Sequence, residues 1–334
     1  MKEKVYRLID ANINRSLEGL RVIEDIARFI LDDKKLTLRL KKIRHTIKAF
    51  SKEIEKQGLG SRDIKKDVGR GTIKSEKGRG GVMDIFRSNI KRLEESMRVL
   101  EEFSKLAAKK FSGKIKQARY EVYDIEKIVS ARLQKNEKLN FDLYVVSDSL
   151  KVLRQAVAAG AKAVQLRIKD KTKSEVLKVA KKAVKLLKNK ATVIINDYPD
   201  IAKKAGADGV HVGEGSISVK RARKVVGDDK IVGGSAYNLA QFRAVSRQAP
   251  DYIGVGPIFP TPIKAGRKPL KIKGLRRVMK AVTIPIVAIG GIDNRNIGKI
   301  VACGISRIAV IRAVNEARDT RKAVRRLIRA IRAS

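Results

Sequence analysis

Tryptophan is absent from this chain of 334 residues, and only one residue is cysteine. Because aromatic residues make up 4% of the sequence, few side chains are available for stacking on unpaired nucleic-acid bases. A single cysteine, Cys303, excludes an intramolecular disulfide framework and a cysteine zinc cluster, and its apolar neighbours predict inert packing within a helix. No apolar run reaches the roughly 18–20 residues of a membrane span, and no signal-peptide core follows Met1, so we expect a cytoplasmic protein without a membrane partner.

Acidic residues are also scarce, and the formal net charge is +42. Such an excess is typical of nucleic-acid-binding proteins. Here, however, residues 1–138 carry +15 and the remainder carries +27, so the excess is spread along the chain. This spread favours a general lysine bias, and we do not expect a nucleic-acid partner. The same positive field would steer small anionic substrates toward the protein.

The chain divides by pattern into two parts. Residues 1–134 have helical periodicity and almost no strand signal, whereas residues 141–334 alternate short apolar runs with amphipathic helices. The polar stretch 134–140 predicts a linker between them. We therefore expect a small all-α domain followed by an α/β domain, and the chain is long enough for both.

An internal repeat marks the helical part. The pattern Asn12-Ile13-x-Arg15-x-x-Glu18-x-x-Arg21-Val22-x-Glu24 recurs as Asn89-Ile90-x-Arg92-x-x-Glu95-x-x-Arg98-Val99-x-Glu101. Spacings of three and four residues place side chains on one helix face, so two like helices are expected to pack together. A further helix is predicted at about 36–57 and another at about 114–134. The charged face is either a solvated ladder of ion pairs or a ligand-binding face.

The segment 58–81 is rich in glycine, lysine and arginine. It contains no G-x-x-x-x-G-K-[ST] sequence, so a P-loop is not expected. A flexible basic loop and a phosphate-gripping lid are the two interpretations that its composition allows.

Eight short apolar runs begin at residue 141, each followed by a helix, with the last helix at about 315–333. The runs lie at approximately 142–147, 163–168, 192–196, 208–212, 230–234, 251–255, 285–289 and 307–311. This alternation predicts a compact (β/α)8 TIM barrel, whose active site would lie at the C-terminal ends of the strands. A doubly wound sheet is the alternative, but no G-x-G-x-x-G follows the first run.

Polar residues gather where these strands end. Arg167 and Lys169 are two residues apart on one predicted strand and share a face, and Lys264 follows the sixth strand. Three cations around one cavity are costly without an anion, and a pyrophosphate group would supply that anion. Asp197, which follows Asn196, is placed to bind Mg²⁺, because that ion is held through one or two carboxylates plus substrate phosphates.

A second anion site is predicted after the last two strands. Gly290 and Gly291 follow the seventh strand, and the turn 310–313 follows the eighth. The corresponding loops of such barrels bind phosphate, since backbone N–H groups and a helix N-terminus converge there. Two anion sites and a metal indicate an enzyme that joins two phosphorylated small molecules and releases pyrophosphate.

The order of the strand-end motifs resembles that of thiamine phosphate synthase, and the resemblance covers residues 141–334. It rests on Gln165-Leu166-Arg167-Ile168-Lys169, Asn196-Asp197, His211-Val212-Gly213, Gly234-Ser235-Ala236, Gly256-Pro257-Ile258-Phe259-Pro260-Thr261 and Gly290-Gly291-Ile292. The family condenses hydroxymethylpyrimidine diphosphate with thiazole phosphate in thiamine biosynthesis, using Mg²⁺. The resemblance implies that diphosphate departs first and that the thiazole nitrogen captures the pyrimidine carbocation, so no side-chain nucleophile is required.

The resemblance also implies a role for each site residue. The residues that would hold the pyrimidine diphosphate are Gln165, Arg167, Lys169, Asn196, Ser235 and Lys264, of which Arg167 and Lys264 would stabilise the leaving diphosphate. Asp197 would bind Mg²⁺. The residues that would hold the thiazole phosphate are Thr261, Gly291, Ile311 and Arg312.

Three positions depart from the family pattern. Ser216 stands where a second Mg²⁺ carboxylate is usual, so Glu214 or Ser216 would be the second metal ligand. Ile263 replaces a usual threonine, and Arg312 replaces a usual serine, where it either grips phosphate or fills the pocket. These changes leave open a barrel that binds phosphate ligands without catalysis. The charge leaves open a basic nucleic-acid-binding protein that reuses the fold.

Two further residues bear on the chemistry of the barrel. His211, on an inward strand position, is interpreted as a hydrogen-bonded core residue. The related thiazole tautomerase uses a histidine after the fifth strand, where this chain has Tyr237, which weakens that alternative.

Residues 1–134 resemble the helical domain that is often fused to thiamine phosphate synthases and is associated with hydroxymethylpyrimidine phosphate kinase activity. The repeated helices and Asp67-Val68-Gly69 carry this resemblance. It implies a multifunctional enzyme in which a kinase supplies the diphosphate to the barrel. The sequence gives no indication of the oligomeric state.

Overall fold

The computed structural model describes residues 2–55, 78, 80–264, 266–281 and 283–333. The chain forms two compact units, Met1–Gln134 and Lys135–Ser334. Most of the glycine-rich segment 58–81, including Asp67-Val68-Gly69, lies outside the described residues. Within the described ranges, every helix is either too short or too polar to span a bilayer.

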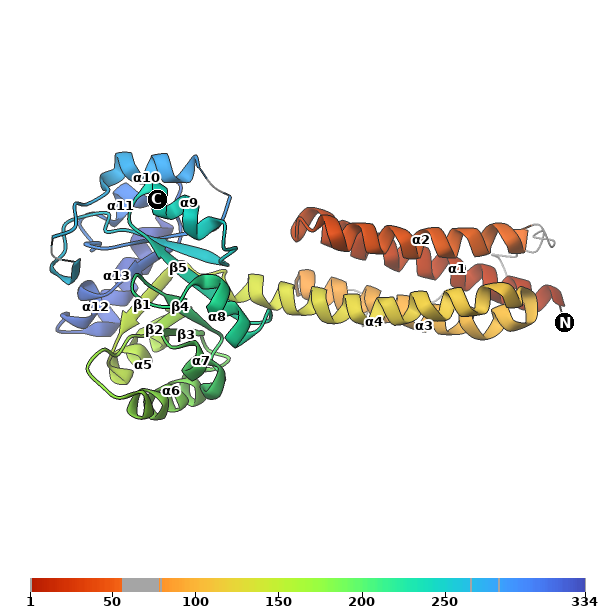
Figure 1. The fold of residues 1–334 in the computed structure, drawn as a ribbon, viewed down its shortest axis with the longest axis horizontal. Coiled ribbons are helices and arrows are strands. Elements are labelled where there is room, and N and C mark those ends of the chain that lie inside the picture. The colour runs from red at the N-terminus through yellow and green to blue at the C-terminus, as the bar shows by residue number, and fades with distance from the viewer. Residues whose placement is uncertain (1, 56–77, 79, 265, 282, 334) are drawn as a thin grey trace. The chain divides into compact units, whose positions relative to one another are not determined.

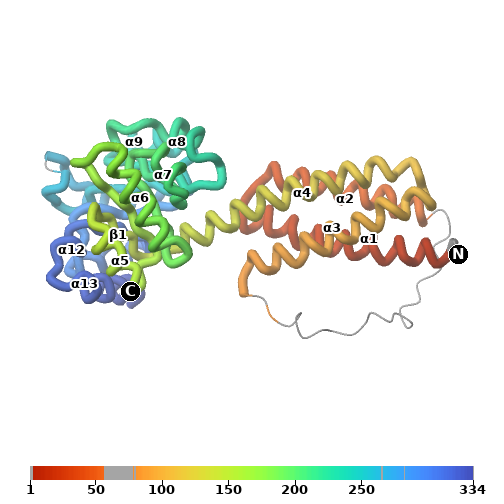
Figure 2. Tube along the Cα trace, turned by 90° about the horizontal axis from the view of Figure 1, so that it is seen from below, coloured from red at the N-terminus to blue at the C-terminus, as the bar shows by residue number. Residues whose placement is uncertain are grey.

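The first unit is built from four long helices, which lie alongside one another in both views (Figures 1 and 2). They are α1 (Lys2–Asp25), α2 (Lys34–Glu55), α3 (Val82–Ala107) and α4 (Lys109–Lys138), with a short π-helix at Ile26–Ile30 after α1. Each helix buries an apolar stripe at three- and four-residue spacing, as an amphipathic helix does. The predicted all-α architecture is confirmed.

The two copies of the repeat lie on α1 and α3, and these helices pack against each other. Ser16 and Ser96 share a buried hydrogen bond of 2.7 Å between their hydroxyl oxygens, and Leu93 lies against Gly19. Since later residues of α1 meet earlier residues of α3, the two helices run antiparallel. The predicted pairing of like helices is confirmed.

The charges of the repeat divide between solvent and core. The exposed members are Arg15, Glu18, Arg21, Arg92, Glu95 and Arg98. The last glutamate of each copy is instead buried and faces an arginine of the following helix. The Arg44 Nε lies 3.3 Å from Glu24, and the Arg119 Nε donates to Glu101 at 2.7 Å. These buried ends of the ladder are structural ion pairs.

The predicted linker 134–140 lies at the boundary between the two units, and α4 continues through it to Lys138. Its polar residues are good helix formers, and two of them are anchored in the second unit. The Lys135 ammonium lies 3.2 Å from the Asp251 carboxylate, and the Lys138 carbonyl accepts a hydrogen bond from the Thr192 hydroxyl at 2.7 Å. The linker is therefore helical as far as Lys138.

The second unit is a closed barrel of eight parallel strands in sequence order, with β1 paired to β8 (Figure 1). The strands are β1 (Leu143–Ser147), β2 (Ala163–Leu166), β3 (Thr192–Asn196), β4 (Gly209–Val212), β5 (Ile231–Ala236), β6 (Tyr252–Val255), β7 (Ile286–Ile289) and β8 (Ile308–Val310). The predicted (β/α)8 barrel is confirmed. The closing pair of strands excludes the doubly wound alternative, in which the sheet stays open.

Helices surround the strands and bury the outer face of the barrel (Figure 1). They are α5 (Leu150–Ala158), α6 (Lys173–Leu187), α7 (Pro199–Ala205), α8 (Val219–Val226), α9 (Leu239–Ser246), α10 (Lys271–Met279), α11 (Ile297–Val301), α12 (Arg312–Asn315) and α13 (Thr320–Arg332). The single helix predicted at 315–333 is thus two helices, since Asp319 caps a new start by accepting from the Lys322 N–H at 2.9 Å.

Cys303 was expected inside an apolar helix, and this expectation is wrong. The residue follows α11 in a turn, is only half-buried, and its thiol lies 3.2 Å from the Lys299 carbonyl. The next strand, β8, begins at Ile308.

Candidate active site

The C-terminal ends of the strands enclose a cavity of about 630 Å³. Its lining includes every predicted substrate residue, namely Gln165, Arg167, Lys169, Asn196, Ser235, Thr261, Lys264, Gly291, Ile311 and Arg312. Asp197 and Glu214 also line it, whereas Ser216 does not. The barrel therefore brings residues from seven strand ends into one site, as the strand-end pattern predicts.

Three cationic side chains reach the cavity from two loops. Arg167 and Lys169 follow β2, which ends at Leu166, so they lie just beyond the strand on which we predicted them. Lys264 ends a short 3-10 helix, Pro262–Lys264, after β6. None of the three forms an ion pair with another described residue, so the site presents uncompensated positive charge to an anionic ligand.

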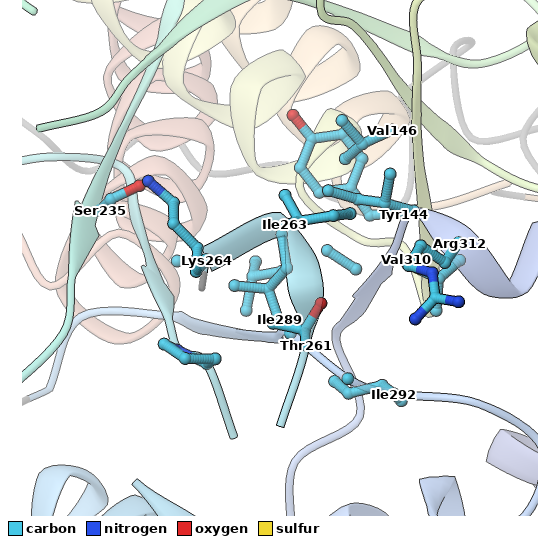
Figure 3. A pocket seen from close by; sticks show the side chains of 18 of the residues that line it. Tyr144, Val146, Ser235, Thr261, Ile263, Lys264, Ile289, Ile292, Val310 and Arg312 are labelled. Atoms are coloured by element: carbon cyan, nitrogen blue, oxygen red, sulfur yellow. The ribbon is translucent and has the colours of Figure 1, made fainter. Parts of the chain in front are cut away.

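Figure 3 shows how these groups are distributed. The Lys264 side chain extends toward Ser235 on one side of the cavity, and Arg312 lies on the other side, with Ile263 and Ile289 between them. The site thus has two separate polar regions with an apolar middle, an arrangement suited to two ligands with charged ends and flat rings.

Asp197 is held rigidly at the end of β3. Its φ of 62° is left-handed, and its backbone N–H donates to the His211 carbonyl at 2.8 Å. One carboxylate oxygen accepts from the Gly213 N–H at 2.9 Å, and the other accepts from the Asn196 amide at 2.5 Å. Each oxygen keeps a lone pair for a further partner.

A divalent cation fits this carboxylate only with help from a ligand. The described residues contain no group of three or more acidic, histidine or cysteine side chains that could enclose a metal ion. Mg²⁺ is commonly bound by one or two carboxylates together with substrate phosphates, and Asp197 beside three cations is consistent with that mode.

The two candidates for a second metal ligand differ. Glu214 lines the cavity but forms an ion pair with Arg267, whose guanidinium lies 3.8 Å above the Tyr237 ring. The Ser216 hydroxyl instead donates to the Asp197 backbone carbonyl at 3.4 Å and lies outside the cavity lining. Of these two, only Glu214 faces the cavity.

The second predicted anion region combines glycine turns with Arg312. Gly291 has a φ of 68°, and a Cβ there would lie 2.5 Å from the Pro260 carbonyl oxygen, so no side chain fits. Arg312 begins α12 and its Nε donates to Glu316 at 2.7 Å. Because this pair lies at the rim, Arg312 does not fill the cavity, contrary to one of the two possibilities raised above.

A buried polar network forms the floor of the cavity, and sequence analysis missed its two tyrosines. Tyr144, Gln165, His211, Ser235 and Tyr252 line this floor and are joined by hydrogen bonds of 2.7–3.1 Å. Both ring nitrogens of His211 have partners, which confirms it as a hydrogen-bonded buried residue. Burial lowers its pKa to about 4, so the imidazole is neutral at physiological pH.

Other missed lining residues come from the loops after β5 and β7. The Lys264 ammonium and the Arg267 guanidinium both lie over the Tyr237 ring. The Asn296 amide donates to the Gly291 carbonyl at 2.8 Å. Sequence analysis named Tyr237 only as the position of the tautomerase histidine, and no motif singled out Asn296. The glycines inside β5 and β6 were the available signal for the floor, since a strand glycine often marks a close approach by another group.

Comparisons with known proteins agree with this geometry. Residues 142–314 match the family model described as "Thiamine monophosphate synthase", and residues 7–128 match the one described as "ThiD2 family". A thiamine-phosphate synthase of Prochlorococcus marinus is 35% identical over 96% of this chain and 93% of its own. Another, of Synechocystis, is 34% identical over 97% and 95%.

Among solved structures, a thiamine phosphate pyrophosphorylase from Pyrococcus furiosus superposes with a TM-score of 0.55. It is 32% identical and covers 60% of this chain and 98% of its own. The family match, the full-length relatives and the cavity at the barrel mouth agree. The chain is a transferase that belongs to the thiamine monophosphate synthase family and carries an N-terminal ThiD2 domain.

Proposed function

We propose that the barrel joins hydroxymethylpyrimidine diphosphate to thiazole phosphate, releasing diphosphate and thiamine phosphate. The bond between the pyrimidine methylene carbon and the diphosphate oxygen breaks, and diphosphate keeps the electron pair. The lone pair of the thiazole nitrogen then forms the new carbon–nitrogen bond. The observation that carries this proposal is the convergence on one cavity of Asp197 and three cations that form no ion pair with another described residue.

The chemistry requires stabilisation of a leaving group more than it requires a nucleophile. In the proposal, Arg167, Lys169 and Lys264 bind the diphosphate, and negative charge builds up on it as the bond breaks. Fixed positive groups that face developing charge lower the barrier because they need no reorganisation. Ser235 donates to the same diphosphate.

Mg²⁺ would be held by Asp197 together with the substrate phosphates, and it would neutralise charge on the leaving diphosphate. The carboxylate is already oriented by the Gly213 N–H and the Asn196 amide. In the proposal, Gln165 and Asn196 also position the pyrimidine ring.

The thiazole phosphate would occupy the region of Gly291 and the 310–313 turn. The backbone N–H groups there and the Thr261 hydroxyl donate to its oxygens. Arg312 supplies a guanidinium in place of a serine hydroxyl, and a guanidinium can bind phosphate through two hydrogen bonds.

The test is diphosphate release by purified protein given both substrates and Mg²⁺. We expect turnover that needs both substrates, loss of turnover in Asp197→Ala, and unchanged turnover in Asp229→Ala, an exposed aspartate before β5. Folded protein that binds phosphate ligands without turnover would support the non-catalytic barrel instead. RNA binding that falls steeply with salt, again without turnover, would support the nucleic-acid alternative.

Glu214 is proposed as the second metal ligand, in competition with Arg267. In Glu214→Gln, we expect a higher Mg²⁺ concentration for half-maximal turnover. An unchanged Mg²⁺ dependence would mean that Glu214 serves only the Arg267 ion pair.

We further propose that the helical unit transfers a phosphoryl group from a nucleoside triphosphate to hydroxymethylpyrimidine phosphate. The ThiD2 match supports this assignment, and the product would be the diphosphate substrate of the barrel. The test replaces the diphosphate substrate with the monophosphate plus ATP and follows thiamine phosphate formation. No product, in protein that uses the diphosphate, would exclude this activity. A cytoplasmic location, where such small phosphorylated substrates occur, is part of the proposal.

A further inference from the structure

The floor of the cavity contains a continuous chain of hydrogen bonds that crosses the barrel. The Gln165 amide nitrogen lies 2.7 Å from the Tyr144 hydroxyl, which lies 3.1 Å from the Tyr252 hydroxyl. That hydroxyl lies 3.0 Å from Nδ1 of His211, and Nε2 of His211 lies 2.8 Å from the Ser235 hydroxyl. Five strands, β1, β2, β4, β5 and β6, each contribute one member.

The barrel makes room for this chain at two glycines. A Cβ at Gly233 would lie 2.2 Å from the Tyr252 ring, and a Cβ at Gly254 would lie 3.2 Å from the His211 ring. Tyr144 and Tyr252 are almost completely buried, at 2% and 1% exposure. Because side chains of ordinary size at 233 and 254 would displace Tyr252 and His211, the strand glycines and the polar chain form one built feature.

Donor and acceptor chemistry allows one direction that satisfies every member of the network. An amide nitrogen only donates, so Tyr144 accepts from Gln165, which leaves its own proton available for Tyr252. In this direction Tyr252 donates to Nδ1 of His211. A neutral imidazole with an accepting Nδ1 carries its proton on Nε2, which donates to the Ser235 oxygen.

Ser235 stands at the cavity end of this chain. In this direction its oxygen accepts from His211, and the described residues offer its proton no second partner. The proton is therefore free to point into the cavity, on the side toward which Lys264 extends (Figure 3). A phosphate oxygen can only accept hydrogen bonds, so a serine fixed as a donor favours that ligand.

We propose that Tyr252 and His211 are positioning residues that hold the Ser235 hydroxyl as a donor to the diphosphate group. This inference rests on the proposed function of the barrel. The two tyrosines and the histidine do not touch the diphosphate; they act through Ser235. If the hydrogen bonds ran in the opposite direction, Ser235 would donate to His211 and would present only lone pairs to an anion.

The first experiment determines which nitrogen of His211 carries the proton in the full-length protein. The sequence has only two histidines, so a ¹⁵N-histidine-labelled sample gives two sets of ring signals, and His45→Gln assigns the exposed one. We expect a proton on Nε2 and an unprotonated Nδ1 at neutral pH. A proton on Nδ1 would overturn the proposal, whatever the turnover of the enzyme.

The second experiment asks whether Tyr252 acts through Ser235. We expect Ser235→Ala to weaken binding of inorganic diphosphate with Mg²⁺ by about ten- to hundredfold, as for loss of a hydrogen bond to a charged group. We expect Tyr252→Phe to weaken it several-fold, and the double variant to bind no more weakly than Ser235→Ala. Additive losses in this cycle would overturn the proposal.

Ser246→Ala is the matched control, because it removes another serine hydroxyl, which donates to the Phe242 carbonyl within α9 and does not line the cavity. We expect it to change diphosphate binding less than threefold. If Tyr252→Phe does not fold, the histidine measurement on the unaltered protein still decides the proposal. A failure of the proposed function would instead appear as absent turnover with an Nε2 proton in place.

Discussion

The two units bury polar groups in different ways. The helical unit buries charged side chains that face a partner within the unit, such as Glu101 with Arg119 and Glu24 with Arg44. At the cavity of the barrel, neutral groups such as His211 and Tyr252 form the floor, and the cations that follow β2 and β6 form no ion pair with another described residue. The buried charges of the helical unit therefore join neighbouring helices, whereas the cavity cations after β2 and β6 are available to an anionic ligand.

The physical reason is the cost of desolvating a charge. A buried ion pair is tolerated when its hydrogen bonds are satisfied, and removing one partner leaves an uncompensated charge. The cavity of the barrel avoids this cost, because its floor is neutral and its cations lie near solvent. Anionic substrates can then supply the missing charge on binding.

The largest expected effect tests the helical side of this comparison. Arg119 donates to Glu101 at 2.7 Å and to the Tyr123 hydroxyl at 2.6 Å. Arg119→Ala should lower the free energy of unfolding of the helical unit by about 3–5 kcal/mol, because it leaves Glu101 buried without its main partner. Urea unfolding followed by far-ultraviolet circular dichroism measures this loss.

Arg98→Ala is the control, since Arg98 pairs with the same glutamate from an exposed position. Its expected cost is below about 1 kcal/mol. Equal losses in the two variants would contradict the distinction between buried and exposed pairs.

The next largest effect is expected on catalysis by the barrel, with no change in the free energy of unfolding. Lys264→Ala should lower kcat/KM for synthesis by about ten- to hundredfold, because one charged hydrogen bond to diphosphate is lost. The midpoint of urea unfolding should stay the same, since Lys264 has no ion pair with a described residue. Lys268→Ala, an exposed lysine of the same loop, should retain full activity. A large loss of stability in Lys264→Ala would show that this cation has a structural role.

A smaller effect concerns pH. Burial raises the pKa of the Glu94 carboxyl, and Glu126 adds to the rise, while Lys91 opposes it. The folded protein therefore holds this proton more tightly than the unfolded chain, whose carboxyl has an ordinary pKa of 4.5. The free energy of unfolding should therefore fall as pH rises above that value. The contribution of Glu94 to the stability of the helical unit should be larger at pH 5 than at pH 7.

Thermal unfolding at several pH values measures this dependence. Glu94→Gln should flatten the pH profile, because it removes the titrating group, while the exposed Glu95→Gln should leave the profile as it is. Identical profiles for Glu94→Gln and the unaltered protein would contradict the assignment.

The smallest effect tests the rim of the barrel. Glu316 holds Arg312 at 2.7 Å and would compete with a substrate phosphate. Glu316→Gln should lower KM for thiazole phosphate about two- to fivefold, in keeping with the small free energy of an exposed ion pair. Arg312→Ala should raise the same KM. A rise in KM for Glu316→Gln would mean that Glu316 orients Arg312 for binding.

The sequence by itself determined the elements and the ends of the strands where function lies. Buried strands of a parallel barrel appear as short apolar runs, so all eight were found within a few residues of their observed bounds. Residues that follow such runs must meet at one end of the barrel, and this rule brought Arg167, Asp197 and Lys264 together in advance. The helical repeat likewise predicted the pairing of α1 and α3.

The tertiary structure alone decided what depends on contacts between distant residues. The polar stretch after residue 134 is held as a helix by contacts of Lys135 with Asp251 and of Lys138 with Thr192. Composition alone does not predict these contacts. The hydrogen bond between Tyr144 and Tyr252 joins residues 108 positions apart, so no local pattern could predict the cavity floor. Local periodicity specifies which face of an element is buried, but only the closed barrel specifies which buried groups meet.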